Sequence, residues 1–257
     1  KEADLEIEDL IAMEDVAITM TNMGYIKRLP LSTYKSQKRG GRGVTGVTTR
    51  EEDFVESIFV ATTHDVILFF TDQGNVYKLK AYEISEAGRT ARGLAIVNLL
   101  PLKPGEKITA VIPIRDFGEA RYMFFATRHG TVKKTLLSEY ESSRKTGLIA
   151  IGLKPGDELI AVRMVDRHDE VLLGTKNGMG IRFSVDDVST MGRTAHGVKG
   201  VTLKDDDELV SAEIIKKDSD VLVVTRNGFG KRIPESEFRL QKRGGVGVII
   251  QKSIKKT

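Results

Sequence analysis

Cysteine and tryptophan are both absent from the 257 residues, and aromatic residues make up only 6% of the chain. The lack of cysteine excludes disulfides and thiolate metal sites, and it fits a reducing cytosol. No apolar run approaches the roughly 18–20 residues that a membrane helix needs, and the first residues do not form a signal peptide. Because the chain begins at Lys1 and not at Met, we expect it to be a fragment of a larger protein.

Catalytic and cofactor-binding patterns are also scarce. No glycine-rich phosphate loop precedes a helical pattern, so we expect this chain to bind no ATP. The acidic runs at 186–187 and 205–207 are expected to lie in solvated turns. The histidines are scattered, without the spacing of a metal-binding pair; they are His64, His129, His168 and His196. The sequence therefore predicts no catalytic residue, no metal site and no cofactor in this chain.

A repeated unit is what the sequence does contain, and it decides the predicted fold. The pattern Thr-x-x-Gly-x-x-x-(Lys/Arg) occurs five times, and its threonines lie 50, 56, 48 and 50 residues apart. A second glycine follows the first at 19 residues in four units and at 17 in the other. The five copies are Thr21, Gly24 and Arg28; Thr71, Gly74 and Lys78; Thr127, Gly130 and Lys134; Thr175, Gly178 and Arg182; Thr225, Gly228 and Arg232.

Each unit has the composition of β-strands. Short β-branched or aromatic runs precede the first glycine, at 16–20, 66–70, 122–126 and 221–224, and strands that alternate cations with apolar residues follow it. The pairs Asn177-Gly178 and Asn227-Gly228 predict two-residue hairpin loops. One more strand precedes each unit from the second onward. Short turns are expected at 31–34 and 236–238, and no stretch has a convincing helical period.

Units of about 50 residues with about four strands are the size of propeller blades. One such sheet cannot bury both of its faces, so the blades must stack and share a core. We therefore predict an all-β, propeller-like single domain over residues 1–257. Separate small β-modules are the alternative, but no Pro/Gly/Ser-rich linker divides the units. The predicted repeats cover roughly 10–53, 54–104, 105–155, 156–205 and 206–257.

The densest cluster of positive charge is the stretch 37–43, where three cations and three glycines share seven positions. Glycines let a backbone approach a ligand closely, and the planar arginine fork suits phosphate oxygens. The net charge is only +4, but acids and bases are segregated along the chain, which matters more for a polyanionic partner. A solvated basic loop without a partner is the alternative. The stretch consists of Gln37, Lys38, Arg39, Gly40, Gly41, Arg42 and Gly43.

This stretch, called the box below, is identical to the signature box of the C-terminal domain of the DNA gyrase A subunit. The flank at 14–21 and the box-like segments 88–93 and 192–197 agree with it, so the chain resembles that domain over essentially its whole length. The resemblance implies a propeller-like disc, the β-pinwheel, whose blades exchange strands with their neighbours. It also implies that the domain wraps duplex DNA around its edge in a right-handed sense, which gives the whole type IIA topoisomerase its directional, negative supercoiling.

The same resemblance implies partners and a location. The domain is expected to be monomeric alone and, in the bacterial cytoplasm with the chromosome, to work in a heterotetramer of gyrase A and B subunits. ATP and magnesium are expected to act only in other parts of that enzyme. Two features depart from the family: five repeats stand where six are frequent, and Val246 replaces the second arginine in the near copy at 241–247. The alternatives for the first are a sixth blade outside this chain, a five-bladed ring or an open ring. We expect the near copy to be a weaker DNA contact than the box; the alternative is a turn that is retained for packing and has lost charge.

Wrapping requires many contacts, because bending roughly 40 bp through half a turn costs on the order of 10 kcal/mol. A single basic loop releases too few counterions to offset that cost. We therefore predict a track of cations at recurring positions, which contacts phosphates and reads few bases, with the box as the anchor of one end. Beyond the box, the predicted track consists of Lys27, Arg28, Lys35, Lys78, Lys80, Arg89, Arg92, Lys133, Lys134, Arg144, Lys145, Arg182, Arg193, Lys231, Arg232, Lys242 and Arg243.

Three other functions are compatible with repeated β-units. The equivalent domain of topoisomerase IV is a related DNA wrapper that lacks an intact box. A protein-binding propeller scaffold would present aromatic or apolar loops, whereas the loops here are basic and tryptophan is absent. A propeller enzyme would need acids or histidines that converge near a channel, and the sequence offers no such set.

Overall fold

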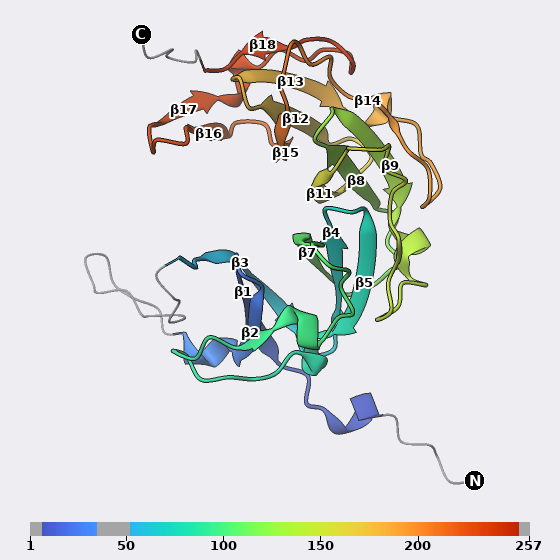
Figure 1. Cartoon of the computed structure of the whole chain (residues 1–257), viewed down its shortest axis with the longest axis vertical. Coiled ribbons are helices and arrows are strands. Elements are labelled where there is room, and N and C mark those ends of the chain that lie inside the picture. Colours follow the sequence, from blue (N-terminus) through green and yellow to red (C-terminus); the bar gives the residue numbers. More distant parts are fainter. Residues whose placement is uncertain (1–6, 35–51, 252–257) are drawn as a thin grey trace. The chain divides into compact units, whose positions relative to one another are not determined.

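The computed structural model describes residues 7–34 and 52–251, and these parts of the chain are all-β, as the repeats predict (Figure 1). The helices there are 3-10 turns of three or four residues, and none is long and apolar enough to cross a membrane. The short turns expected near 31–34 and 236–238 are among them. The turns are η1 Ile7–Leu10, η2 Leu31–Thr33, η3 Ala81–Glu83, η4 Ile96–Asn98, η5 Leu137–Tyr140, η6 Val185–Asp187 and η7 Glu235–Glu237.

Eighteen strands are present in the described residues, and they include the runs predicted before each hairpin glycine. Their bounds are β1 Asp15–Thr21, β2 Tyr25–Pro30, β3 Val55–Thr62, β4 Val66–Thr71, β5 Asn75–Lys80, β6 Leu94–Ala95, β7 Ile108–Ile114, β8 Tyr122–Thr127, β9 Thr131–Leu136, β10 Leu148–Ile149, β11 Leu159–Val165, β12 Glu170–Thr175, β13 Met179–Ser184, β14 Val198–Lys199, β15 Leu209–Ile215, β16 Asp220–Val224, β17 Gly230–Pro234 and β18 Val248–Ile249.

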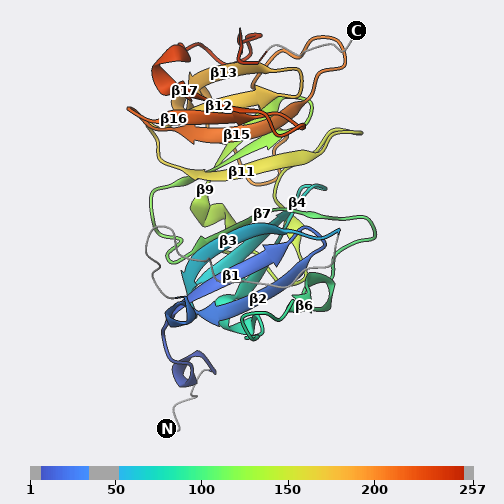
Figure 2. The same cartoon turned by 90° about the vertical axis from the view of Figure 1, so that its left-hand side faces the viewer.

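One rule builds the four larger sheets, which have the orders β3-β1-β2-β6, β10-β5-β4-β7, β11-β8-β9-β14 and β15-β12-β13-β18. The central hairpin of each sheet comes from one repeat, and both outer strands come from the next repeat along the chain. In the first sheet β3 lies antiparallel to β1, and the two-residue strand β6 lies antiparallel to β2 (Figure 2). The strand exchange that the resemblance implies is thereby confirmed. A sheet in space is therefore not identical to a repeat in the sequence.

The fifth hairpin, β16–β17, forms a two-stranded sheet within the described residues. Leu222, six residues before the hairpin glycine, is 67% exposed, whereas the residues at this position in the other four hairpins are buried. Those residues are Ile18, Leu68, Phe124 and Leu172. Outer strands from a following repeat are thus what buries this position in the other sheets.

The threonine and glycine of the repeat build each hairpin loop. In the first copy the Gly24 N–H donates to the Thr21 carbonyl oxygen over 2.9 Å, and the Tyr25 N–H donates to Thr21 Oγ1 over 3.2 Å. Gly24 has a φ of 84°, in the left-handed region that favours glycine. The other four threonines make the same side-chain bond over 3.1–3.3 Å. Three residues therefore separate the strands in the first four hairpins, and five separate β16 from β17. The two-residue loops predicted from the Asn-Gly pairs are wrong, because the threonine hydroxyl stabilises the wider turn.

Two compact units divide the chain, and each has its own hydrophobic core. The first unit comprises Lys1–Phe69, Val76–Asp116 and Ser143–Leu148, and the second comprises Phe70–Asn75, Phe117–Ser142 and Ile149–Thr257. Ile18, Ile67 and Phe69 lie in the first core. Phe124, Leu173 and Phe183 lie in the second. The hairpins supply these side chains, so burial of the hairpins positions the loops that join one repeat to the next.

Candidate nucleic-acid interface

The box and Lys35 lie outside the described residues, so the predictions made for them stay predictions. The residues concerned in the box are Gln37, Lys38, Arg39, Gly40, Gly41, Arg42 and Gly43. The structure does describe the four loops that occupy the place of the box in the later repeats, at 88–93, 142–147, 192–197 and 241–247. We refer to these as the box-like loops.

A left-handed glycine ends every box-like loop. Gly93, Gly147, Gly197 and Gly247 have φ values between 84° and 96°. At Gly93 and Gly197 an added Cβ would also overlap the carbonyl oxygen of the preceding repeat's hairpin. The short outer strands β6, β10, β14 and β18 start directly after these glycines. The glycines thus let each loop run tightly against the second hairpin strand of the preceding repeat.

Lys27 on β2 is fully buried at the point where the loop 88–93 crosses that strand. Its Nζ donates to the carbonyl oxygens of Gly88, Arg89 and Ala91 over 3.2, 2.6 and 2.8 Å. An ammonium group has three donors, so three carbonyls can satisfy it without water. Burial lowers the pKa of Lys27. This side chain holds the following loop and presents no surface to a nucleic acid.

Lys133 on β9 repeats this arrangement in the second unit. It is fully buried, and its Nζ donates to the carbonyl oxygens of Ala150, Arg193 and Gly192 over 2.7, 2.5 and 3.4 Å. The ammonium also lies 4.9 Å from the ring centroid of Phe125, a distance at which a cation and an aromatic face attract. Burial, with a smaller contribution from the charge of Arg193, lowers the pKa of Lys133 to about 7.

In the first, third and fourth copies, the basic residue that defines the repeat pattern contacts the 3-10 turn of the next repeat or the residues beside it. The Nε of Arg28 donates to the Ile84 carbonyl oxygen over 2.7 Å. The Nζ of Lys134 donates to the Val185 carbonyl oxygen over 3.1 Å, and burial lowers the pKa of Lys134. Lys134 is 5% exposed, and the Arg28 side chain is 16% exposed. In these three copies the recurring cation joins successive repeats.

Arg182 makes the most extensive of these contacts. Its guanidinium pairs with Glu170 and Glu235 over 2.5 Å each, and Nη1 also donates to the carbonyl oxygens of Glu235 and Phe238. The side chain is 14% exposed. Arg182 therefore links the fourth sheet to η7, and its Nε and Nη1 already donate to four acceptors within the chain.

The remaining predicted cations are exposed or partly exposed. Arg89, Arg144, Lys145 and Lys242 are exposed on the box-like loops, and Lys231 and Arg232 are exposed on β17. Partly exposed positions are Lys78, Lys80, Arg92, Arg193 and Arg243. Whether any of these cations contacts DNA stays a prediction.

Several of these cations have acidic or aromatic neighbours. Lys242 pairs with Asp187 over 2.8 Å, and Lys145 pairs with Glu83 over 3.5 Å. Arg92 lies over the Tyr25 ring at 4.0 Å. Exposed ion pairs contribute about 0–1 kcal/mol, so a phosphate can replace the carboxylate partner at little cost.

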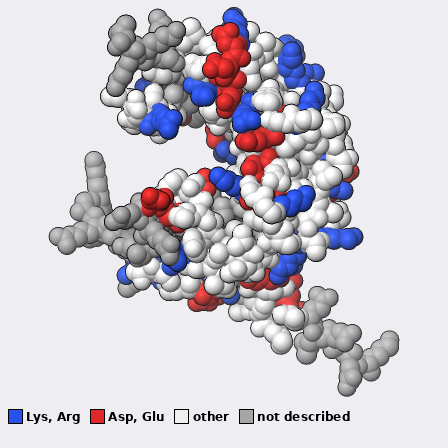
Figure 3. All heavy atoms as spheres, in the orientation of Figure 1, with Lys and Arg blue, Asp and Glu red and all other residues white. Residues whose placement is uncertain are grey.

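On the face drawn in Figure 3, Lys and Arg occur as separate small groups with Asp and Glu between them. Lys199, exposed on β14 directly after the loop 192–197, is a further cation that the sequence prediction did not include. Its place two residues after the terminal glycine Gly197 is the signal by which the sequence could have identified it. Separate basic positions of this kind are better suited to individual contacts with phosphates of a nucleic-acid backbone than to binding through one continuous basic surface.

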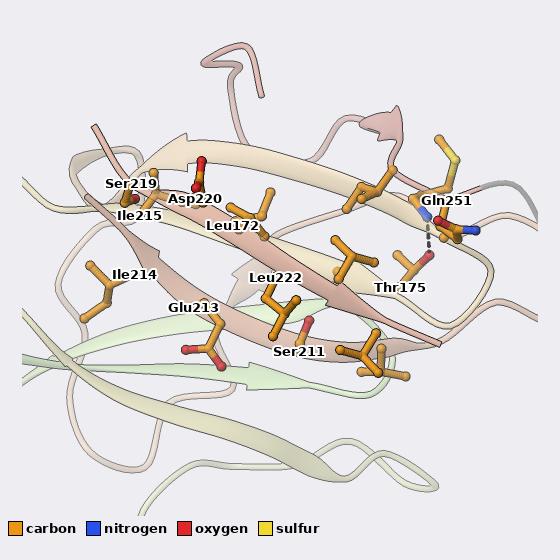
Figure 4. A pocket seen from close by; sticks show the side chains of 18 residues that line it. Leu172, Thr175, Ser211, Glu213, Ile214, Ile215, Ser219, Asp220, Leu222 and Gln251 are labelled. Carbon is orange, nitrogen blue, oxygen red and sulfur yellow. Dashed lines mark hydrogen bonds between the residues drawn. The ribbon is translucent and has the colours of Figure 1, made fainter. Parts of the chain in front are cut away.

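A groove of about 470 Å³ lies between the fourth sheet and the fifth hairpin (Figure 4). Leu172, Ile215 and Leu222 form much of its wall, and Glu213 and Asp220 are acidic groups on its lining. Histidine is absent from the lining, and no group of three or more His, Cys, Asp or Glu in the described residues is placed to hold a metal. The groove lies beside the two-stranded sheet β16–β17, and its lining has no arrangement suited to nucleophilic or acid–base chemistry.

Comparison with known families and structures agrees with this architecture. The family described as "DNA gyrase C-terminal domain, beta-propeller" matches residues 15–62, 65–115, 121–166, 169–216 and 219–256. The chain is 56% identical to the DNA gyrase A subunit of Clostridium acetobutylicum over 256 residues, which is all of this chain and 31% of that protein. It is 46% identical to the corresponding Mycolicibacterium smegmatis protein over 94% of this chain and 29% of that protein. The chain thus spans about a third of the length of these relatives.

Two solved structures are similar in three dimensions. The crystal structure of the C-terminal domain of DNA topoisomerase IV has a TM-score of 0.81 at 35% identity, covering 95% of this chain and 75% of that one. The structure of a DNA gyrase A C-terminal domain has a TM-score of 0.74 at 27% identity, covering 91% of this chain and 76% of that one. Both structural similarities confirm the predicted all-β fold of the β-pinwheel type.

Proposed function

Because the chain belongs to the DNA gyrase C-terminal domain family, we propose that it binds duplex DNA through the loops of successive repeats and bends it into a wrap. Wrapping of DNA is the role of this domain family. The observation that carries the proposal is the recurrence of one loop design in the described repeats. In each copy, cations stand on a backbone that a terminal left-handed glycine and the preceding hairpin hold in place.

The contacts proposed for this wrap are phosphate contacts. Lys and Arg side chains on loops can reach phosphate oxygens, whereas reading of bases requires an element inserted into a groove. The proposed contact set combines the box with the exposed or partly exposed cations of the box-like loops. Outside the box this set consists of Arg89, Arg92, Arg144, Lys145, Arg193, Lys242 and Arg243.

Burial decides which of the predicted cations are left out. Lys27, Lys133 and Lys134 are buried and bonded to carbonyl oxygens, so a phosphate could reach them only after those bonds had broken. Arg28 and Arg182 are mostly covered and bonded within the chain. Lys78, Lys80, Lys231 and Arg232 stay as secondary candidates because part of each is accessible.

A linking-number assay tests the proposal. Nicked plasmid is closed by ligase in the presence of the chain, and a right-handed wrap, as the family implies, should leave the product positively supercoiled after the protein is removed. Substitution of Arg39→Ala together with Arg42→Ala should abolish the shift while leaving part of the DNA affinity. A wild-type chain that binds duplex DNA without changing its linking number would refute wrapping.

A second candidate is the wrapping mode of topoisomerase IV, which the structural similarity to that enzyme's domain favours. In that mode the box has no special role. The double arginine variant would then give the same linking-number shift as the wild type, so the same assay separates the two candidates.

The larger assembly also belongs to the proposal. The curated gyrase relatives are about three times longer than this chain, so in a bacterial cytoplasm the chain would act with the remainder of such a protein and with gyrase B. ATP hydrolysis and DNA breakage would take place in those other parts, and this chain would need no cofactor of its own.

A further inference from the structure

Two buried lysine side chains occupy equivalent positions in the two units of the chain. Lys27 in the first unit and Lys133 in the second follow their hairpin glycines at the same distance, and both are fully buried. Each is bonded to carbonyl oxygens of the box-like loop of the next repeat. A buried charge without partners would be strongly destabilising, so these bonds are required for the folded arrangement.

We infer that Lys27 and Lys133 are positioning residues, which fix the loops that carry Arg89 and Arg193 and do not themselves contact nucleic acid. The inference about DNA rests on the proposed function; the inference about the loops does not. It assigns to these two lysines a task different from that of the exposed cations with which the sequence grouped them.

The bonds are made to the backbone of each arginine itself and of its neighbours. Lys27 binds the carbonyl oxygen of Arg89 itself, together with those of Gly88 and Ala91 on either side. Lys133 binds the carbonyl oxygens of Gly192 and of Arg193 itself. The Arg89 and Arg193 backbones are therefore held from the inner side of each loop, while Arg89 is exposed and Arg193 partly exposed.

The other described hairpins hold their loops differently. Tyr77 occupies the same position in the second hairpin, where its ring lies against Gly147 and its hydroxyl donates to Glu106 over 2.9 Å. Ile181 occupies it in the fourth and lies near Gly245. The loops held by lysine are the two that read Gly-Arg-Thr-Ala, at 88–91 and 192–195. A buried lysine at this hairpin position thus occurs together with one loop sequence, Gly-Arg-Thr-Ala, whose backbone carbonyl oxygens accept its hydrogen bonds.

A restrained loop loses less conformational entropy when a phosphate binds its arginine. Loss of the ammonium should therefore weaken DNA binding through Arg89 or Arg193, even though the lysine does not touch the DNA. That indirect effect distinguishes a positioning residue from a contact residue.

Hydrogen exchange of the full 257-residue chain without DNA is the first arm of the test. Lys27→Met should speed exchange of the amides in the loop 88–93 by roughly tenfold or more, the effect of losing charge-assisted hydrogen bonds, and leave those of 192–197 unchanged. Lys133→Met should do the reverse. Lys231→Met is the matched control, because Lys231 holds the same position in the fifth hairpin and is exposed, and it should change neither loop.

A double-mutant cycle on the affinity for a linear duplex is the second arm. If Lys133 acts through Arg193, Lys133→Met should weaken binding several-fold in the wild type and have little further effect in Arg193→Ala. Lys231→Met combined with Arg193→Ala should be additive. The cycle with Lys27→Met and Arg89→Ala repeats the measurement in the first unit.

Each result has a definite meaning. Unchanged exchange in both loops, or additive cycles, would overturn the inference, and additive cycles would return the lysines to the contact set. Wild-type chain that does not bind duplex DNA would refute the proposed function, while the exchange arm would still decide whether the lysines hold the loops. Lys27→Gln and Lys133→Gln, which keep two donors, serve if a methionine variant does not fold.

Discussion

Arg182 offers the sharpest test of how the repeats are joined. Replacing it with methionine keeps most of its apolar volume but removes the guanidinium that pairs with Glu170 and Glu235. Both carboxylates would then lose their counter-charge, and the Phe238 carbonyl would lose its donor. Removal of one partner from a buried ion pair costs about 3–5 kcal/mol. Because Glu170 is 29% exposed and so partly solvated, we expect about 3 kcal/mol.

The matched control is Arg232→Met. Arg232 occupies the same position in the fifth hairpin, but its side chain is 77% exposed and lies 3.6 Å from Asp220. An exposed pair of this kind contributes about 0–1 kcal/mol. Thermal denaturation followed by circular dichroism should therefore show a melting temperature lowered by about 6–12 °C for Arg182→Met and by about 0–4 °C for Arg232→Met.

Hydrogen exchange locates the change. The amides of η7 and β17 should exchange faster in Arg182→Met, because the arginine links this segment to the fourth sheet, whereas the first unit should be unaffected. Equal melting temperatures for the two variants would refute the reasoning that the recurring cation joins the repeats.

Three more perturbations give clear expectations. The pKa of Lys133 is about 7 in the folded chain and about 10.4 in the unfolded chain. Between these pH values the unfolded chain binds more protons, so this group makes the free energy of unfolding rise with pH, by at most about 1.4 kcal/mol per pH unit. Urea denaturation of wild type and Lys133→Met from pH 6 to 9 measures the difference, and parallel curves of stability against pH would contradict this expectation. Gly197→Ala should cost about 1–3 kcal/mol because its φ is 96° and the Cβ meets the Val132 carbonyl, whereas Gly192→Ala, with nothing within 4 Å, should stay within about 0.5 kcal/mol in a thermal melt. Joint replacement of Arg144 and Lys145 by alanine should reduce the slope of log affinity against log salt by about 2. Replacement of the exposed pair Lys216 and Lys217, in the turn before β16, should leave the slope unchanged. A wild-type slope in the Arg144 and Lys145 variant would exclude the loop 142–147 as a phosphate contact.

Local chemistry made the hairpins predictable. Thr21 and Gly24 act on residues within the same turn, so their spacing alone predicts where a strand ends and the next begins. The runs predicted before four of the glycines are rich in β-branched and aromatic residues, and they became β1, β4, β8 and β16. The first three of these strands are buried, whereas β16 is largely exposed. The loop length was harder to predict, because a threonine hydroxyl competes with the Asn-Gly preference and only the folded turn shows which one prevails.

The roles of the cations could not be predicted in the same way. Lys27 and Lys231 follow their hairpin glycines at the same distance, yet one is buried and the other exposed. The difference arises from a loop that lies about 60 residues further along the chain in the case of Lys27. Burial by a distant segment leaves no trace in local periodicity, so the sequence predicted one uniform track where the structure has two kinds of position.

The borrowing of outer strands has a consequence for synthesis on the ribosome. A hairpin such as β1–β2 emerges well before β3, and earlier still before β6, so its sheet edges stay unpaired while the intervening chain is made. Unpaired edges are sites of wrong pairing, and the nascent chain would need either rapid elongation or a chaperone to protect them. Each newly synthesised repeat would supply the outer strands of the preceding sheet and expose the unpaired edges of its own hairpin, so that folding would proceed repeat by repeat from the N-terminal side.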